Sequence, residues 1–217
     1  MPEIVTTPIS YFEVEMEYAS PDIKMWLDRV NVVQALFVAL KPWDITVDDV
    51  EIITTGKPSE QGIRFKIPKK LSSFFFGPAY CKFTRDGTSW ETAEETIHIL
   101  DTAFKALVGE TGAIVTKRKT VIVLHAQPKT LQFFQILAPF VSTKLAALEP
   151  EPPNTMATVV KWPKRKLTLD GSGQLANGIF LRFEREFDGD LSYEEMAQRL
   201  RTDETEVFKM LDIEEEA

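Results

Sequence analysis

The sequence predicts an α+β fold, in which a mostly antiparallel sheet carries long amphipathic helices packed on one face. Apolar and acidic residues alternate from Tyr11 to Tyr18, a period of two that is typical of a half-buried strand. From Thr88 to Val108, apolar residues recur at three- and four-residue steps, which indicates a helix. The expected order of elements is β-α-β-β-β-α-β-α, then a linker, then β-β-α. A mostly antiparallel sheet fits this order best.

A long helix is expected from about Asp22 to Leu40. Ser20, Pro21 and Asp22 are typical of a helix start, and Pro42 ends the helix. One face carries Ile23, Trp26, Leu27 and Val30. The second half of this helix is apolar nearly all round, so we expect it to be deeply buried.

The middle of the chain alternates short strands and turns before a second helix. Val50 to Thr55 and Ile63 to Ile67 are predicted strands. The next stretch, Phe74 to Thr84, is interrupted by Gly77 and Pro78, so it forms one bent strand or two short ones. The helix from Thr88 to Val108 is closed by the glycines that follow it.

In the second half, Ala113 to His125 is predicted as a strand or hairpin, and Leu131 to Leu137 as a short helix. Further strands are expected from Thr158 to Leu169 and from Ile179 to Phe187, and a helix from Ser192. The EPEPP run at 149–153 is a linker candidate. It would separate an α+β domain at 1–148 from a β-hairpin and a C-terminal helix or helical hairpin at 154–217, which is expected to pack on the first part.

Composition indicates a globular protein of a reducing compartment. Hydrophobic residues make up 44% of the 217, and the single cysteine, Cys81, cannot form an internal disulfide. No apolar run reaches the roughly 18 residues of a membrane span, and the first residues lack the pattern of a signal peptide. We therefore expect a cytoplasmic protein without a membrane partner.

The residues that could carry catalysis form no recognisable motif. The two histidines, His98 and His125, show no metal-ligand spacing, and His125 is expected to hydrogen-bond at a strand end. Cys81 follows an aromatic stretch, where a buried small side chain is the usual interpretation. Phosphate-binding loops, nucleophile elbows and calcium loops are absent from the sequence. We expect no enzymatic activity, no cofactor and no metal.

Charge is segregated along the chain, which is its most unusual feature. Residues 1–60, 61–112, 113–169 and 170–217 carry net charges of −7, +1, +7 and −9. The basic stretch contains two clusters, and one of them includes an aromatic residue. The candidate partner-binding residues are Lys117, Arg118, Lys119, Lys161, Trp162, Lys164, Arg165 and Lys166. Cations beside a flat ring suit nucleic acid, and a basic surface also suits an acidic protein surface.

The segment from Ser192 to Leu211 has the apolar pattern of a helix-turn-helix. Asp203 and Glu206 could cap its second helix. Two features disagree: Arg201 stands where the turn usually has glycine, and the second helix is mostly acidic, which phosphates would repel. A helical hairpin or one long helix that packs or binds protein is the alternative.

The chain resembles a group of uncharacterised bacterial proteins that are sporadically distributed among genomes. The residues that carry the resemblance are the opening strand, Tyr11 to Tyr18, and the stretch Ile179 to Leu211, which includes GIFLRFEREF followed by SYEEMAQRL. The resemblance implies a strand leading into a helix at the beginning and a strand leading into an amphipathic helix at the end. It implies no activity and transfers no functional residue.

The leading hypothesis is a non-enzymatic protein that binds protein, either itself or another subunit, in a larger assembly. Its basic central surface and acidic termini would form the contacts. Nucleic-acid binding by the basic clusters or by the helix-turn-helix-like segment is the alternative. A third hypothesis is a pocket for a small apolar ligand, lined by Phe74, Phe75, Phe76 and Trp90.

Overall fold

The computed structural model describes residues 2–140 and 157–216. The linker candidate at 149–153 lies outside the described residues. The α+β class and the mostly antiparallel sheet predicted from the sequence are confirmed. The only parallel pairing with a described register joins the two ends of the chain, where Glu3 lies opposite Ile213.

Two compact units make up the fold, and each is assembled from separate stretches of the chain. The central unit comprises Phe12–Thr120 and Glu186–Ala197, and the terminal unit comprises Met1–Tyr11, Val121–Arg185 and Gln198–Ala217. Three strands contribute to both units, because β1 spans Glu3–Tyr18, β6 spans Val115–Pro128 and β9 spans Ile179–Asp188.

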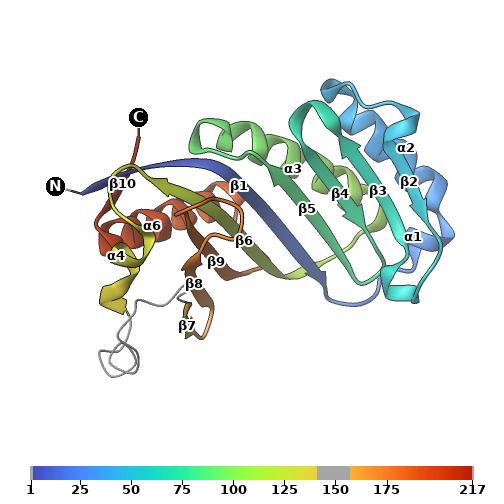
Figure 1. The fold of residues 1–217 in the computed structure, drawn as a ribbon. Helices are drawn as coiled ribbons and strands as arrows, with labels where there is room; N and C mark the ends of the chain where they lie inside the picture. The colour runs from blue at the N-terminus through green and yellow to red at the C-terminus, as the bar shows by residue number, and fades with distance from the viewer. Residues whose placement is uncertain (1, 141–156, 217) are drawn as a thin grey trace. The chain divides into compact units, whose positions relative to one another are not determined.

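In the central unit the strands follow the order β2-β3-β4-β5-β1-β6. Here β2 is Val50–Ile53, β3 is Gly62–Ile67, β4 is Ser72–Phe76 and β5 is Tyr80–Asp86. The two main helices, α2 (Arg29–Leu40) and α3 (Ala93–Thr111), lie on the same side of these strands (Figure 1). A one-turn helix, α1 (Lys24–Leu27), precedes α2.

Alternate residues of each strand face the helices and form the core of the central unit. This core is aromatic. The rings of Phe74 and Phe76 stack at 5.5 Å, and Phe74 lies 4.7 Å from Phe83. From β1, Val14, Met16 and Tyr18 complete this face, while Glu17 is exposed. The alternation predicted for Tyr11 to Tyr18 is confirmed, and the strand begins eight residues earlier than expected.

The helix expected over 22–40 is broken. Asp28 adopts φ −118° and ψ 34°, which ends α1, and α2 starts at the next residue. The expectation of deep burial is wrong: α2 buries only Val32, Leu36 and Leu40, whereas Val38 is 64% exposed. The physical reason is that one helix surface packs into the unit, and the described residues cover the apolar side chains on the rest of the helix only partly or not at all.

The terminal unit has the strand order β1-β6-β9-β8-β7, and β10 (Ile213–Glu215) pairs with β1. Its other elements are α4 (Phe133–Leu137), β7 (Thr158–Trp162), β8 (Arg165–Gly171) and α6 (Tyr193–Leu211), of which the first residues of α6 belong to the central unit. The single strand expected over 158–169 is instead a hairpin, in which Trp162 lies opposite Arg165. Pro163 lacks an amide hydrogen and has a fixed φ, so the chain turns there.

Candidate functional site

The first basic cluster lies on β6 in the central unit, and its three residues alternate between solvent and core. Lys117 and Lys119 are exposed, and the ammonium of Lys117 lies 3.3 Å from the carboxylate of Glu186. Arg118 is only 7% exposed. The strand alternation therefore separates side chains that the sequence placed in one cluster.

Arg118 holds the segment between β9 and α6 against the sheet of the central unit. Its guanidinium carbon lies 4.5 Å from the centre of the Tyr193 ring and 5.9 Å from that of Phe104. Its Nη1 donates to the carbonyl oxygen of Leu191, and this nitrogen lies 3.7 Å from the sulfur of Met196. In this arrangement the cation serves internal packing, and an external partner would not reach it.

The second basic cluster occupies the β7–β8 hairpin of the terminal unit. Lys161 pairs with Lys166 across the hairpin, and Trp162 pairs with Arg165. The guanidinium carbon of Arg165 lies 4.6 Å from the Trp162 ring centre, and Trp162 is 42% exposed. The hairpin therefore presents a flat ring beside cations near its turn.

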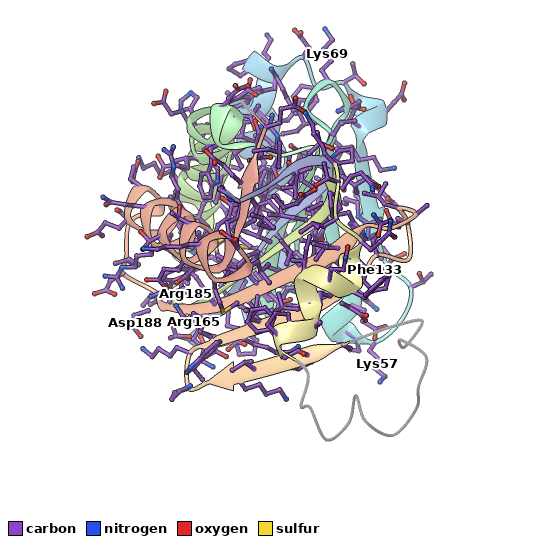
Figure 2. The ribbon with its side chains drawn as sticks, turned by 60° about the vertical axis from the view of Figure 1, so that its left-hand side comes forward. Lys57, Lys69, Phe133, Arg165, Arg185 and Asp188 are labelled. Atoms are coloured by element: carbon purple, nitrogen blue, oxygen red, sulfur yellow. The ribbon has the colours of Figure 1, made fainter. Side chains whose placement is uncertain are left out.

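Carboxylates of the terminal unit neutralise much of this second cluster. Nη1 of Arg165 donates to Asp203 at 2.8 Å, and Arg185 donates to the other oxygen of Asp203 at 2.5 Å. Figure 2 shows Arg165 and Arg185 close together, in agreement with this shared partner. Lys166 lies 2.6 Å from Glu184, which also accepts from Arg182. The basic stretch of the sequence is thus largely paired within the chain.

The helix-turn-helix expectation is corrected by α6, which is one continuous helix from Tyr193 to Leu211. Arg201 is helical, and its carbonyl oxygen accepts a bond from the Thr205 hydroxyl at 2.8 Å. Asp203 caps no helix, because it lies in the middle of α6 and binds the two arginines. The absence of glycine at the supposed turn was the signal for a continuous helix.

The four proposed pocket residues do not face a common space. Phe74 and Phe76 are fully buried on the helix side of β4. Phe75 points to the opposite side, where its ring lies 5.3 Å from Tyr80. Trp90 begins a short 3-10 turn, Trp90–Thr92, and is half-buried. The structure brings only the two core phenylalanines together.

His125 and Ser172 form a polar pair in the terminal unit that the sequence did not predict as a pair. His125 Nδ1 lies 2.7 Å from Ser172 Oγ, and His125 is 6% exposed. The same Oγ accepts hydrogen bonds from the backbone N–H groups of Gln174 and Leu175, at 3.1 and 3.0 Å. Ser172 therefore organises the loop before β9, and its own hydrogen is left to donate to Nδ1 of a neutral imidazole. Burial lowers the pKa of His125, which favours that neutral form.

The other residues that could take part in catalysis are either buried in the core or exposed to solvent. Cys81 is fully buried 3.9 Å from the sulfur of Met16, and burial raises the pKa of its thiol to about 12. His98 is exposed beside the Trp43 ring. Among residues 2–140 and 157–216, no three histidine, cysteine, aspartate or glutamate side chains gather as metal ligands would. Within the same ranges, no helix has the length and hydropathy needed to cross a membrane.

The feature that sequence reasoning missed is an exposed apolar surface on α1 and α2. Its members are aliphatic side chains at helical spacing, with exposed fractions of 60, 83, 77 and 64% for Ile23, Leu27, Val30 and Val38. Between Val30 and Val38, the exposed polar side chains are Asn31 and Gln34, and neither carries a charge. The periodicity was visible in the sequence, but it did not reveal which line of the helix would be buried.

Comparisons with known proteins identify no family. No protein-family model matches the sequence, and no curated protein matches it. Among solved structures, the chain is similar to a rolling circle replication initiator protein from Geobacillus stearothermophilus, with a TM-score of 0.36 and 11% identity. That match covers 92% of this chain and 80% of the other. Similarity at this level carries no argument about fold or function.

Replacing His125 with glutamine should reduce the pH dependence of stability. Because the folded pKa lies below the ordinary value of 6.5, the unfolded chain takes up a proton first as the pH falls. Wild-type stability should therefore be fully present above pH 6.5 and decrease below it. Urea unfolding at several pH values should show a shallower decrease for His125→Gln than for wild type. The control His98→Gln changes the exposed histidine, and an equal effect of both changes would contradict the assignment.

Asp203→Asn should destabilise the terminal unit strongly. The change leaves Arg165 and Arg185 without their shared carboxylate, whose side chain is 8% exposed. Because the side chains of Arg165 and Arg185 are 37 and 25% exposed, water replaces part of the lost interaction, and a cost of about 1–3 kcal/mol is expected. The control Glu206→Gln removes a carboxylate that is 61% exposed and lies 3.4 Å from Arg165, so about 0–1 kcal/mol is expected. Equal urea midpoints for the two variants would rule out Asp203 as the anchor.

Proposed function

We propose that this chain is a non-enzymatic protein-binding subunit of a larger assembly, and that α1 and α2 form its binding surface. The observation that supports this most is the composition of α2. From Val30 to Leu40 the helix has no charged residue, although its outer side is exposed to solvent. A helix that is apolar nearly all round is normally covered on more than one side.

The packing of α2 within the chain accounts for only part of its apolar surface. Val32, Leu36 and Leu40 are buried at four-residue steps, which is the line that packs inward. Val30 and Val38 belong to a different line and remain 77 and 64% exposed. Exposed apolar surface that gathers on one element can mark an interaction site in a soluble protein. A partner protein would remove these side chains from water.

This proposal moves the contact surface away from the basic residues. Arg118 lies in the core of the central unit, and Arg165 and Lys166 have carboxylate partners in the terminal unit. Exchanging such internal pairs for external ones would leave buried carboxylates unpaired, which is costly. The apolar surface of α1 and α2 has no such competing partner among the interactions of the described residues.

The test is the recovery of partners from an extract of the native host. The tagged wild-type chain is expected in a complex heavier than the chain itself, measured by native mass spectrometry. The double variant Val30→Glu with Val38→Glu should be absent from that complex, because two carboxylates would be buried in the interface. The control Ile114→Glu changes an aliphatic side chain outside α1 and α2 that is 70% exposed, and it should behave as wild type.

Recovery of the same complexes with the double variant would show that α2 is not the binding surface. If wild type enters no heavier complex, the proposed function itself fails. Circular dichroism and urea unfolding of each variant establish that the chain is folded. The exposed positions of both valines predict that stability changes by less than about 0.5 kcal/mol.

A second candidate function is binding of single-stranded nucleic acid by the β7–β8 hairpin. It rests on Trp162, whose ring is 42% exposed and lies beside Arg165, with the exposed Lys161 next in sequence. Bases stack on such rings, at about 1–3 kcal/mol per base.

Trp162→Ala should weaken the binding of a labelled single-stranded oligonucleotide at least tenfold, since this corresponds to about 1.4 kcal/mol. Fluorescence anisotropy at about 50 and 200 mM salt measures the effect. Lys161→Glu should weaken binding and reduce its salt dependence. Lys209→Glu, an equal charge change on α6, is the control. Undetectable wild-type binding at the lower salt concentration would eliminate this candidate.

A further inference from the structure

The loop between β8 and β9 links the buried His125 to the beginning of α4. Ser172 lies at the start of this loop, in contact with the imidazole of His125. Asn177 lies near its end and binds the chain at α4 through both polar atoms of its side-chain amide. Its Oδ1 accepts from the N–H of Phe133 at 2.8 Å, and its Nδ2 donates to the carbonyl oxygen of Leu131 at 3.0 Å.

The loop is compact, so we expect its residues to move together. The N–H of Ser172 donates to the carbonyl oxygen of Gly178 at 2.7 Å, which closes the loop at its ends. A β-carbon added at Gly178 would lie only 2.9 Å from the β-carbon of Ser172. The Phe133 ring packs on Gly171, where an added β-carbon would lie 3.1 Å from the ring. A change at Ser172 is therefore expected to reach Asn177 and the start of α4.

The hydrogen-bonding capacity of the Ser172 hydroxyl is fully used while His125 is neutral. A hydroxyl has two lone pairs and one hydrogen. Its lone pairs accept from the N–H groups of Gln174 and Leu175, so its hydrogen lies toward Nδ1 of His125. A proton on Nδ1 would put a second hydrogen between two atoms that are 2.7 Å apart. The neutral imidazole fits this arrangement, whereas the imidazolium requires Ser172 to give up a backbone bond.

We propose that His125 and Ser172 form a pH-sensitive latch, which holds the start of α4 at neutral pH and releases it when Nδ1 of His125 takes up a proton. The moving part is the loop from 172 to 178, together with the hydrogen bonds of Asn177 to the chain at α4. All of these residues belong to the terminal unit. The latch is therefore independent of the binding surface proposed on α1 and α2.

Few ionisable side chains surround His125, so little negative charge is available to stabilise the added proton. The loop from 172 to 178 and the helix α4 contain no ionisable residue. On β6, the residues two positions away on the same face are Val123 and Gln127, which are uncharged. From β9, the ring of Phe180 lies 5.2 Å from the imidazole.

The ionisable side chains of the neighbouring strands either have partners of their own or stay neutral near pH 6. They are Asp170, which accepts from the N–H of Gly171, Arg182, which donates to Glu184, Glu3, which accepts from Thr130 and Leu131, and the phenol Tyr11. Accordingly, it is burial that lowers the pKa of His125, without a contribution from a neighbouring charge.

The direction of the lowered pKa gives the pH range in which the latch opens. Opening of the loop exposes His125 to water and restores its ordinary pKa of 6.5. The open form therefore binds the proton more tightly than the closed form. Above pH 6.5 the loop keeps its full stability. Between that value and the lowered pKa of the closed form, the equilibrium constant for opening should rise about tenfold for each unit by which the pH falls.

Amide hydrogen exchange of the purified full chain, followed by NMR between about pH 5 and 8, tests the latch. Protection factors, which correct for the intrinsic pH dependence of exchange, should fall below pH 6.5 for the amides of Gln174, Leu175 and Phe133. Low concentrations of urea should not change these three protection factors, because a local opening exposes little surface. The amides that join β8 to β9 exchange by unfolding of the unit, so urea should lower their protection.

Three variants separate the steps of the latch. His125→Gln has no group that titrates in this range, so the protection of the Phe133 amide should lose its pH dependence, and the control His98→Gln should keep it. Ser172→Ala should raise the pKa of His125, measured on its imidazole by NMR, because the donor to Nδ1 is lost. Asn177→Gly keeps the positive φ of 59° accessible and removes both side-chain bonds. In that variant Phe133 should be unprotected at every pH, while the pKa of His125 stays lowered.

Two results with wild type alone would overturn the latch. The first is a protection factor of the Phe133 amide that does not change between neutral pH and the pKa of His125. The second is the same urea dependence for this amide as for the amides that join β8 to β9, which would mean that α4 is released only when the unit unfolds. An equal loss of pH dependence in His125→Gln and His98→Gln would also contradict it. None of these results bears on the binding surface of α1 and α2.

Discussion

In this fold α2 packs only one side into the central unit, and this constraint governs the functional interpretation of the chain. In α2 the inward line consists of Val32, Leu36 and Leu40. The residues between them are also mostly apolar, so the outer side of the helix keeps aliphatic side chains in contact with water. Exposing aliphatic side chains to water is unfavourable in free energy. Burial of these side chains against another surface removes that cost. The proposal of a protein-binding role therefore rests on packing geometry.

The charged residues follow a different principle, which is neutralisation within each unit. Asp203 binds Arg165 and Arg185, while Glu184 binds Lys166 and Arg182. Such pairs hold α6 and the neighbouring strands together, and they reduce the positive field of the basic stretch. Arg118 is an exception, since rings and a carbonyl oxygen surround its guanidinium. Charge segregation along the sequence is therefore compatible with local charge balance in the fold.

Local periodicity predicted the elements well where one face of an element differs clearly from the other. The alternation from Phe12 to Tyr18 identified a strand, and the apolar repeat before Gly109 identified α3. The same reasoning was wrong for the residues around Pro163, because apolar and basic residues continue through the turn. It also missed β10, since three residues carry too little pattern and their pairing with β1 joins opposite ends of the chain.

The sequence by itself determined the fold class, the aromatic core strands and the absence of known catalytic motifs, because these depend on residue type and short-range spacing. Only the tertiary structure decided which face of each element is covered. It placed Arg118 in the core and Lys117 at the surface, although the two are adjacent in sequence. It also left Val30 and Val38 exposed on an apolar helix. Such outcomes depend on contacts between residues far apart in the chain, which no local pattern encodes.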